Sequence, residues 1–384
     1  MSSFRLDCTS CSSSEQGPEA IAAYKCTHCG TDLSFSPSGT RPLQDLSGRR
    51  LRAPWRYADM LPVKILGGQP AATDEVRRSA LLEKMLGVQS VWLVDATGLA
   101  TGTFKDYEAI VIMAMAAELN LDFVSVHSTG NTVLAYRHYA EELGVRCAII
   151  VPAANMSKLD GLPDLTDWPV VAVDGPYKQF SAIARSVAAE RGWHHLAPLP
   201  WKLEGKAALA WMIYENCPQV DLIVQTIAGG FGPLGMELGF RRLAAVGEFY
   251  GVASRRRYLL LQPSDADGIA RAWRKGSSRI EPCDIPLPEL PFEPTLQSAN
   301  PNTTLPHLRR NLPRGTRIGS VSESLVAKHY PTAHRAFLEA DIPVSYEREK
   351  SAYIALAGLL EARLEPTSNV AVIVTGSRPF RAPR

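Results

Sequence analysis

The sequence predicts an α/β protein built on parallel sheets that helices cover on both faces. Two observations carry this prediction. Short, near-continuous runs of β-branched and other apolar residues recur from about residue 90 onward, which is typical of strands buried on both faces. Amphipathic stretches of helical length separate these runs, and such alternation favours parallel strands joined by crossover helices. The length of 384 residues leaves room for two or more domains.

The expected elements follow the apolar runs in order. The first predicted helix carries Ile110, Met113 and Ala117 on one side, and Pro152 ends the third strand because proline donates no ladder hydrogen bond. The strands are expected at residues 91–94, 123–126, 147–151, 170–173, 222–225, 258–261 and 371–374. The helices are expected at residues 107–119, 132–143, 180–191, 203–215 and from 236 onward. Residues 277–316 are rich in proline, asparagine and charged side chains, which predicts a long irregular connection.

The composition excludes several classes of partner. Hydrophobic residues make up 46% of the chain and charged residues 21%, as in ordinary globular proteins. A net charge of +2 creates no strong field, so neither a nucleic acid nor a membrane is expected as a partner. No apolar run is long enough to span a bilayer, and residues 1–9 lack the apolar core of a signal peptide. We therefore expect a cytoplasmic protein.

Four of the seven cysteines form two Cys-x-x-Cys pairs in a segment, residues 1–45, that is rich in serine, glycine and threonine. These cysteines are Cys8, Cys11, Cys26 and Cys29, with fourteen residues between the pairs. Four thiolates at this spacing can close a tetrahedral structural zinc site, and so small a segment needs a bound metal ion to fold. The alternative is a pair of turns whose ligands no longer hold a metal. The other three cysteines are expected to be reduced thiols.

Residues 101–107, Thr-Gly-Thr-Phe-Lys-Asp-Tyr, follow the first predicted strand and open a helix. The small, flexible residues before Lys105 permit another group to approach the backbone closely. A lysine that is held there out of water and partly unprotonated suits the formation of a Schiff base with an aldehyde. On this run alone, a surface lysine after a tight turn explains the residues equally well.

Three further segments follow predicted strands and suit polar ligands. Residues 128–132, Ser-Thr-Gly-Asn-Thr, enter a helix with hydroxyl and backbone N–H groups that suit a carboxylate, and a simple N-cap needs fewer of them. Residues 228–235 are rich in glycine and precede a helix, which suits a phosphate, although tight packing also favours glycine. Residues 374–377 offer a hydroxyl to a ring nitrogen. Open α/β sheets bind their ligands at such carboxyl ends of strands.

Together these segments predict pyridoxal phosphate with an amino-acid substrate, because they offer an amine for an aldehyde, a phosphate cradle, a hydroxyl for a pyridine nitrogen and a carboxylate loop. The chain resembles the threonine synthase-like family of fold-type II pyridoxal-phosphate enzymes, which includes threonine synthase and cysteate synthase. The resemblance spans nearly the whole chain. It rests on residues 55–57, 61–62, 101–106, 128–132, 204–206 and 349–356, which follow the family's order.

The resemblance implies an α/β, fold-type II, tryptophan synthase β-like architecture of two domains. Residues 46–110 and 190–384 would form the large domain that binds pyridoxal phosphate, and residues 111–189 a small α/β domain. Residues 1–45 would form a zinc-ribbon-like segment, which also occurs in some relatives. Dimers are usual among relatives, so a homodimer is expected.

The resemblance also implies roles by position. Lys105 is the expected catalytic residue, which bonds to the cofactor aldehyde and moves the substrate's α-proton. The expected cofactor contacts are Phe104 beside the ring, Asn131 at the ring hydroxyl, Thr375 at the pyridine nitrogen, and Gly229, Gly230, Phe231 and Gly232 at the phosphate. The expected contacts to the substrate carboxylate are Ser128, Thr129, Gly130 and Thr132.

Some basic residues and histidines invite two interpretations. Arg137, Lys158 and Lys202 are candidates for holding a substrate phosphate, although such charges are usually only solvated. His127, which precedes the 128–132 loop, is either a proton relay or a packing residue. The pair at residues 194 and 195 lacks the spacing of a metal site and is interpreted as structural.

The chain departs from the family pattern in segments that concern the substrate. Leu99-Ala100 replaces the usual Asn-Pro, and Tyr107 replaces the usual arginine after Lys105-Asp106. Residues 66–72 differ from the usual Gly-Glu-Gly-Asn-Thr-Pro-Leu, and Phe231 and Pro233 are larger than their counterparts. These differences predict a specialised paralogue in place of threonine synthase itself.

The expected function is β- or γ-replacement, or elimination, on an amino acid with an activated, O-phosphorylated leaving group. The enzyme would be threonine synthase-like or cysteate synthase-like and would belong to amino-acid biosynthesis or specialised metabolism. One alternative is a lyase of the serine/threonine dehydratase type. The other is a catalytically inert relative that binds a partner through its four-cysteine segment.

Overall fold

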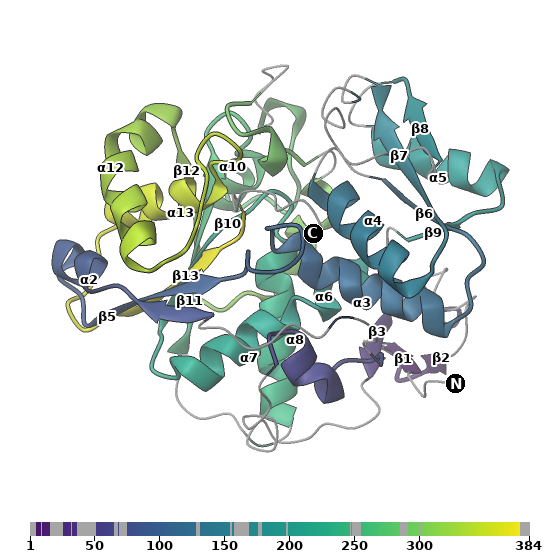
Figure 1. The fold of residues 1–384 in the computed structure, drawn as a ribbon, viewed down its shortest axis with the longest axis horizontal. Coiled ribbons are helices and arrows are strands. Elements are labelled where there is room, and N and C mark those ends of the chain that lie inside the picture. Colours follow the sequence, from purple (N-terminus) through teal and green to yellow (C-terminus); the bar gives the residue numbers. More distant parts are fainter. Residues whose placement is uncertain are drawn as a thin grey trace. The chain divides into compact units, whose positions relative to one another are not determined.

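The structure is a computed structural model in which the chain groups into two compact units (Figure 1). Unit 1 comprises residues 1–71 and 105–208, and unit 2 comprises residues 72–104 and 209–384. The predicted domain division at residues 45, 110 and 190 stays a prediction. The residues that the structure describes are 5–8, 10–15, 26–31, 33–36, 51–64, 68, 75–127, 131–153, 156, 169–175, 179–196, 199–245, 247, 255–284, 291–298 and 301–376.

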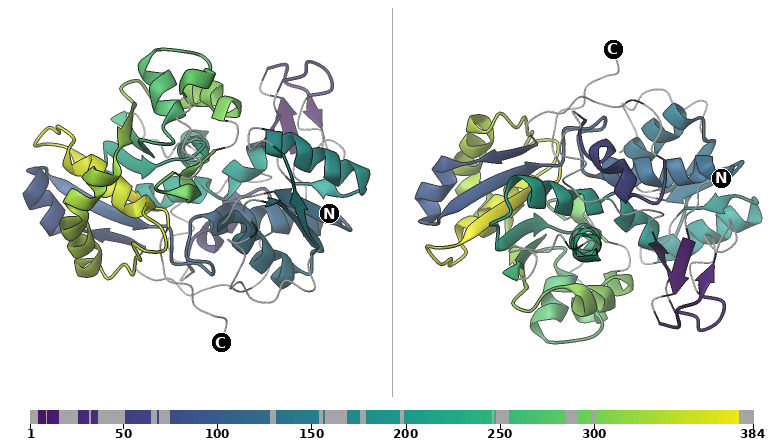
Figure 2. Two further views of the ribbon diagram at one scale, coloured as in Figure 1. Left: turned by 90° about the horizontal axis from the view of Figure 1, so that it is seen from above. Right: turned by 90° about the horizontal axis from the view of Figure 1, so that it is seen from below.

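Unit 2 is built on a six-stranded sheet with the strand order β12-β11-β10-β13-β5-β4. All its neighbouring pairs are parallel except the edge pair of β4 and β5. Both views of Figure 2 show β5 and β13 side by side. The strands are β4 Val76–Arg78, β5 Ser90–Asp95, β10 Leu222–Thr226, β11 Arg257–Pro263, β12 Arg317–Val321 and β13 Asn369–Val374. The helices are α2 Ala80–Leu86, α8 Phe231–Ala245, α10 Gly268–Arg274, α11 Leu305–Asn311, α12 Glu323–Glu339 and α13 Ser351–Leu360.

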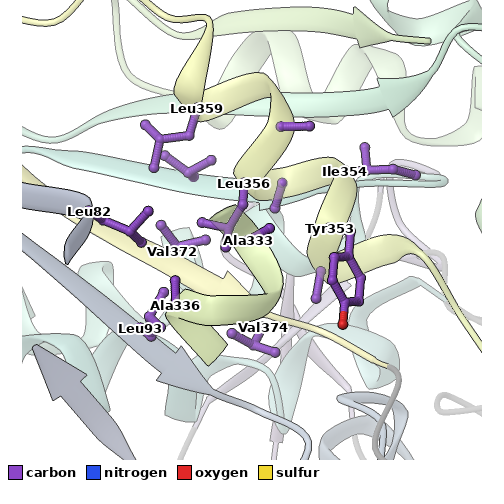
Figure 3. Close-up of a cluster of buried hydrophobic side chains, with 14 of the residues drawn as sticks. Leu82, Leu93, Ala333, Ala336, Tyr353, Ile354, Leu356, Leu359, Val372 and Val374 are labelled. Carbon is purple, nitrogen blue, oxygen red and sulfur yellow. The ribbon is translucent and has the colours of Figure 1, made fainter. Parts of the chain in front are cut away.

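The core of unit 2 lies between this sheet and the helix pair α12 and α13. Every residue of β13 is buried, because helices cover both faces of a parallel sheet and the strand sequence is correspondingly apolar. Figure 3 shows Leu356 of α13 and Ala333 of α12 close to Val372 of β13, with Leu93 of β5 nearby. Burying such side chains stabilises the fold by roughly 1.5–3 kcal/mol each. The packing holds the carboxyl ends of β10, β13 and β5 in one rigid edge.

Unit 1 contains a parallel sheet with the order β8-β7-β6-β9 and a small antiparallel sheet with the order β2-β1-β3. Residues 106–116 of α3 are all buried, which makes this helix the centre of the unit. The strands are β1 Arg5–Cys8, β2 Ser14–Glu15, β3 Leu33–Ser36, β6 Val124–His127, β7 Cys147–Pro152, β8 Val170–Val173 and β9 His194–His195. The helices are η2 Trp55–Met60, α3 Lys105–Glu118, α4 Asn131–Leu143, α5 Phe180–Glu190 and α6 Leu199–Glu204, while α7 Ala207–Asn216 runs from unit 1 into unit 2.

The structure confirms the α/β class and every predicted strand, with shifts of one or two residues at the ends. The helix predicted at 203–215 is two helices, α6 and α7, which meet at Gly205. A Cβ atom on Gly205 would overlap the Tyr107 carbonyl oxygen of α3, so α3 passes too close to the junction for any side chain. Among the described helices, none has the length and apolarity that a membrane crossing needs.

Two predictions about where helices occur were wrong. The helix after the glycine-rich turn begins at Phe231, five residues before the predicted start, because Gly232 and Pro233 fit a first helical turn. The connection at 277–316 was predicted to be irregular, but it holds α11 and the short helices η5 Pro282–Asp284, η6 Pro294–Leu296 and η7 Pro301–Thr303. Prolines at the first turn of such helices leave no backbone donor unsatisfied.

Candidate active site

Three predicted site segments leave neighbouring strands of the unit 2 sheet at the same edge. The glycine-rich turn at 228–232 follows β10, Thr375 follows β13, and residues 96–104 lead away from β5. Because these strands are adjacent and parallel, their carboxyl ends share one edge of the sheet. This is the edge at which open α/β sheets bind ligands. The strand order therefore brings the three segments together.

Lys105 is tied to this edge through its chain neighbour. The backbone N–H of Phe104 donates a hydrogen bond of 2.9 Å to the carbonyl of Thr375, directly after β13. Gly102 turns the chain in the left-handed region, with φ of 74°, which suits glycine. Lys105 is the next residue after Phe104 and the first residue of α3. The residue that precedes α3 is thus hydrogen-bonded to the residue that follows β13.

The side chain of Lys105 faces a buried carboxylate. Its Nζ lies 3.8 Å from Oε2 of Glu108, whose side chain is only 2% exposed. The same oxygen is paired with Nζ of Lys206, which is completely buried. Sequence reasoning noticed Lys206 only as part of a motif and missed Glu108. A carboxylate three residues after a lysine in a predicted helix is the signal that would have found it.

The glycine-rich turn brings backbone close to other groups. Gly230 has a φ of +83°, and a Cβ atom there would lie 2.8 Å from Leu308 Cδ1. A Cβ atom on Gly232 would overlap the side-chain amide of Gln225. The turn runs directly into α8, a helix of 15 residues, so the first N–H groups of α8 have no partners within the helix. Backbone N–H groups and the helix dipole at such a helix start suit an anion.

Gln225 is a site residue that sequence reasoning missed. It lies on β10, is completely buried, and neither its Oε1 nor its Nε2 has a hydrogen-bond partner among the described residues. Leaving a buried amide unsatisfied costs about 1–3 kcal/mol. Since its amide lies against Gly232, a ligand in the turn is the natural partner for it. A polar residue inside an apolar strand is the sequence signal for such a group.

Thr375 heads a chain of hydrogen bonds at the end of β13. The buried Thr375 hydroxyl donates to Oγ of Ser351 at 3.3 Å, and the Ser351 hydroxyl donates to the carboxylate of Glu349. A Cβ atom on Gly376 would overlap that carboxylate, so glycine is required there. The contact to Ser351 is long, so the Thr375 hydroxyl can instead rotate and donate to an acceptor at the edge of the sheet. The 349–356 segment was predicted only from the resemblance, without this chain of contacts.

Several predicted residues lie outside the described residues. They are Ser128, Thr129, Gly130, Lys158 and the serine at 377. Asn131 begins α4, but its side chain is also outside the description, and Thr132 is a half-buried residue in the first turn of α4. Of the basic candidates, Arg137 is paired with Glu141 at 2.8 Å. Burial, together with the charge of Lys105, lowers the pKa of Lys202 to about 8.

The four cysteines of the N-terminal pairs come together in space. The sulfur atoms of Cys8, Cys11, Cys26 and Cys29 all lie within 4.8 Å of one another. Each Cys-x-x-Cys pair lies in a turn that is closed by the same backbone hydrogen bond. The N–H of Cys8 donates to the carbonyl of Ser13, and the N–H of Cys26 donates to the carbonyl of Thr31, both at 2.8 Å. Tetrahedral zinc with bonds of about 2.3 Å places its sulfur ligands about 3.8 Å apart. The closest pairs here are separated by 3.4 and 3.6 Å, which fits that geometry.

Comparison with known proteins identifies a family and several relatives. The family profile described as "Pyridoxal-phosphate dependent enzyme" matches residues 71–376. The chain is 26% identical over 300 residues to the threonine synthase of Methanocaldococcus jannaschii, covering 73% of this chain and 70% of that protein. It is 22% identical over 347 residues to the cysteate synthase of Methanospirillum hungatei, covering 84% and 79%. The structure of maize serine racemase is similar in fold, with a TM-score of 0.62, 21% identity, and coverage of 79% of this chain and 89% of that chain.

Proposed function

Because the chain belongs to the pyridoxal-phosphate dependent enzyme family, we propose that it catalyses replacement or elimination on an amino acid with an O-phosphate leaving group. The chain is a fold-type II enzyme of this family, related to threonine synthase and cysteate synthase. The substrate and the reaction are the proposed part. One observation carries the proposal: the lysine segment, the glycine-rich turn and Thr375 follow adjacent parallel strands at one edge of the sheet.

The residues at this edge fit pyridoxal phosphate. The unsatisfied Gln225 amide beside the turn needs a partner, and a phosphate oxygen accepts hydrogen bonds. The turn admits no Cβ atom at Gly232 or Gly230 without displacing a neighbour. Gly229, Gly230, Phe231 and Gly232 are the proposed phosphate contacts. When bound, pyridoxal phosphate supplies an electron sink that stabilises negative charge at the Cα of an amino acid.

The residues of the chain supply the remaining chemistry in this proposal. Lys105 would hold the cofactor by its aldehyde, and once the substrate amine has displaced it, the freed amine of Lys105 would take the proton from the substrate Cα. Thr375 binds the pyridine nitrogen, and Phe104 packs beside the ring. The 128–132 segment, where α4 begins, holds the substrate carboxylate, with Asn131 at the ring hydroxyl. The C–O bond to the phosphate would then break, the phosphate would leave with the electron pair, and water or another nucleophile would add to the substrate.

The proposed substrate class comes from the relatives and from basic side chains. Threonine synthase and cysteate synthase are the curated relatives that match most of this chain. The charge of Lys105 contributes to the lowered pKa of Lys202, which supports a second cation near the reacting amine. A cation there favours an anionic leaving group. Lys158 remains a proposed phosphate contact from the sequence.

The first experiment tests cofactor attachment. The purified protein is mixed with pyridoxal phosphate, reduced with borohydride and digested, and mass spectrometry locates the modified residue. We expect one adduct, on Lys105, and a visible absorbance band that disappears in Lys105→Ala. A Lys84→Ala variant is the matched control, because Lys84 lies on the surface helix α2. A wild-type protein without any adduct would refute the proposed function.

A panel of substrates then identifies the reaction. O-Phosphohomoserine, O-phosphoserine, serine and threonine are each supplied with and without sulfite, and released phosphate and amino-acid products are measured. Phosphate release that requires Lys105 supports the proposal. Keto-acid formation from serine or threonine alone would instead establish a dehydratase-type lyase. No turnover by an adduct-forming protein would leave the binding-protein alternative.

We also propose that the four-cysteine cluster holds a structural zinc ion. The positions of Cys8, Cys11, Cys26 and Cys29 support this proposal, and four thiolate ligands leave no open position for water. The family resemblance further supports a cytoplasmic homodimer, which light scattering of the purified protein tests.

A further inference from the structure

Glu108 is a buried carboxylate shared by two lysines. Its Oε2 lies 3.8 Å from Nζ of Lys105 and is ion-paired with Nζ of Lys206. The exposed fractions of the three side chains are 26% for Lys105, 2% for Glu108 and zero for Lys206. Tyr136 of α4 donates a hydrogen bond to the other carboxylate oxygen at 3.4 Å. The carboxylate is therefore held in place by groups from outside its own helix.

Lys206 is held just as firmly. Its Nζ also donates to the carbonyl of Lys202 in the last turn of α6, at 2.9 Å. Gly205, the preceding residue, lets the α6–α7 junction approach α3 so closely that Lys206 reaches Glu108. The pair joins residues that are 98 positions apart in the chain. Separating the two side chains would be unfavourable unless another group neutralised the Glu108 carboxylate.

The carboxylate of Glu108 faces more than one amine. The titratable groups near Lys105 include Glu108 on α3, Tyr136 on α4, Lys202 on α6 and Lys206 after α6. Two further buried carboxylates, Asp106 and Glu204, lie close to these residues in the chain. One carboxylate neutralises one ammonium. Burial, and next the charge of Lys105, hold the pKa of Lys206 well below its ordinary value. A proton on Lys105 thus opposes a proton on Lys206.

We propose that Glu108 is a positioning residue that stabilises the protonated amine of Lys105, and that Lys206 competes with Lys105 for the Glu108 carboxylate. The inference rests on the proposed function, in which Lys105 takes a proton from the substrate Cα. In that step the C–H bond breaks, its electron pair stays on carbon, and an N–H bond forms on Lys105. The new ammonium on Lys105 lies beside Glu108, and the ion pair between Glu108 and Lys206 weakens.

The test compares variants that change charge while preserving volume. Glu108→Gln removes the negative charge, Lys206→Met removes the competing amine, and the double variant removes both. Glu118→Gln is the matched control, because Glu118 is the last residue of the same helix and lies about 20 Å from Lys105 along the helix axis. The rate of pyridoxal phosphate attachment to Lys105 is measured against pH by stopped-flow absorbance. This profile reports the fraction of Lys105 that is unprotonated, without any catalytic turnover.

The proposal predicts shifts of opposite sign. Glu108→Gln should move the midpoint of the attachment profile to lower pH by about one unit, because the ammonium form loses its counter-charge. Lys206→Met should move this midpoint to higher pH, because Lys206 then no longer competes with Lys105 for the Glu108 carboxylate. The double variant should return close to the wild-type midpoint. Glu118→Gln should leave the profile in place.

A purely structural role gives a different pattern. Glu108→Gln leaves Lys206 buried without the Glu108 carboxylate, so this variant should have a lower melting temperature. The double variant, which also removes the Lys206 amine, should regain the wild-type melting temperature. Unchanged midpoints, or midpoints that move in the same direction in both single variants, would overturn the proposal. If Glu108→Gln does not fold, Lys206→Met and the double variant still decide the direction. Failure of the wild-type protein to form any adduct refutes the proposed function instead, so the two failures are distinguishable.

Discussion

The imidazole rings of His127 and His195 are stacked and hydrogen-bonded to each other, with Nδ1 of His127 2.8 Å from Nε2 of His195. The chain of contacts continues at both ends. Ser125 Oγ lies 2.9 Å from Nδ1 of His195, and Ser181 Oγ lies 2.9 Å from Nε2 of His127. The two rings cannot both be protonated, because N–H groups would then face each other between them. The sequence interpretation of residues 194 and 195 as structural stays a prediction, and His127 fits either of its two interpretations.

This histidine pair predicts loss of stability in mild acid. Burial, and next the positive charge of Lys202, lower the pKa of His195 to about 4, and burial also holds the pKa of His127 well below its usual value. The unfolded chain takes up these protons near pH 6.5, whereas the folded chain does not. Stability is therefore complete above about pH 6.5 and falls as the pH drops from there toward 4.

Thermal melting against pH checks this expectation. The slope should reach about 1.4 kcal/mol per pH unit for each histidine and should shrink in a His195→Gln variant. His138→Gln is the control, since that side chain is 47% exposed. A wild-type melting temperature that stays constant between pH 7 and 5 would contradict the prediction.

Gly205→Ala should destabilise the protein. A methyl group there would overlap the backbone of Tyr107, and backbone cannot move aside as a flexible side chain does. Forced overpacking costs typically 1–3 kcal/mol. Urea unfolding measures the loss. Gly319→Ala is the matched control, because its Cβ would lie at an ordinary 3.5 Å from Leu261. Equal stability of the two variants would show that α3 does not need this close approach.

Thr375→Val should alter the environment of the cofactor ring more than Ser351→Ala does. The first variant removes the hydroxyl proposed to meet the pyridine nitrogen, whereas the second leaves that hydroxyl in place and removes only its acceptor. The ¹⁵N chemical shift of ring-labelled pyridoxal phosphate reports the difference. Thr367→Val, at an exposed position in the same unit, should leave the shift unchanged. Identical spectra for Thr375→Val and wild type would argue against a contact between Thr375 and the ring.

Metal analysis of the purified protein should find one zinc ion per chain. Chelation should expose residues 5–36 to amide hydrogen exchange, because a segment this small depends on its metal for stability. Cys26→Ser should have the same effect, while Cys283→Ser, at an exposed position, should have none. A zinc-free protein with well-protected amides at β1 and β3 would refute the zinc proposal.

Local signals in the sequence predicted much of the fold. Strands such as β7 and β13 are recognisable because nearly every residue in them is apolar and buried, a property that a short window of sequence contains. The helix α13 escaped prediction for a related reason. It is apolar nearly all round, so it lacks the one-sided pattern by which surface helices are recognised. Edge strands such as β4, three residues long, carry too few residues for any pattern.

The predicted site segments were recognisable from sequence because each is a contiguous run. Glycines before Phe231 and the hydroxyl at Thr375 stand next to their strands, so their spacing alone predicts an anion or ring contact. Glu108 and Gln225 were missed because their sequence signals, a carboxylate three residues after Lys105 and a polar residue inside an apolar strand, are too common to indicate a role by themselves. Each becomes a site residue only through a partner, or the lack of one, that the packing of distant segments decides.

The sequence by itself determined the class of fold and the chemistry that its segments suit, because periodicity, glycine placement and a lysine at a helix start are local properties. Tertiary structure decided that β10, β13 and β5 are neighbours and that Lys206 pairs with Glu108 across 98 residues of chain. Such choices depend on packing energies summed over many side chains. No single segment contains that sum, so the edge where the site segments meet and the charge beside Lys105 are visible only in the folded protein.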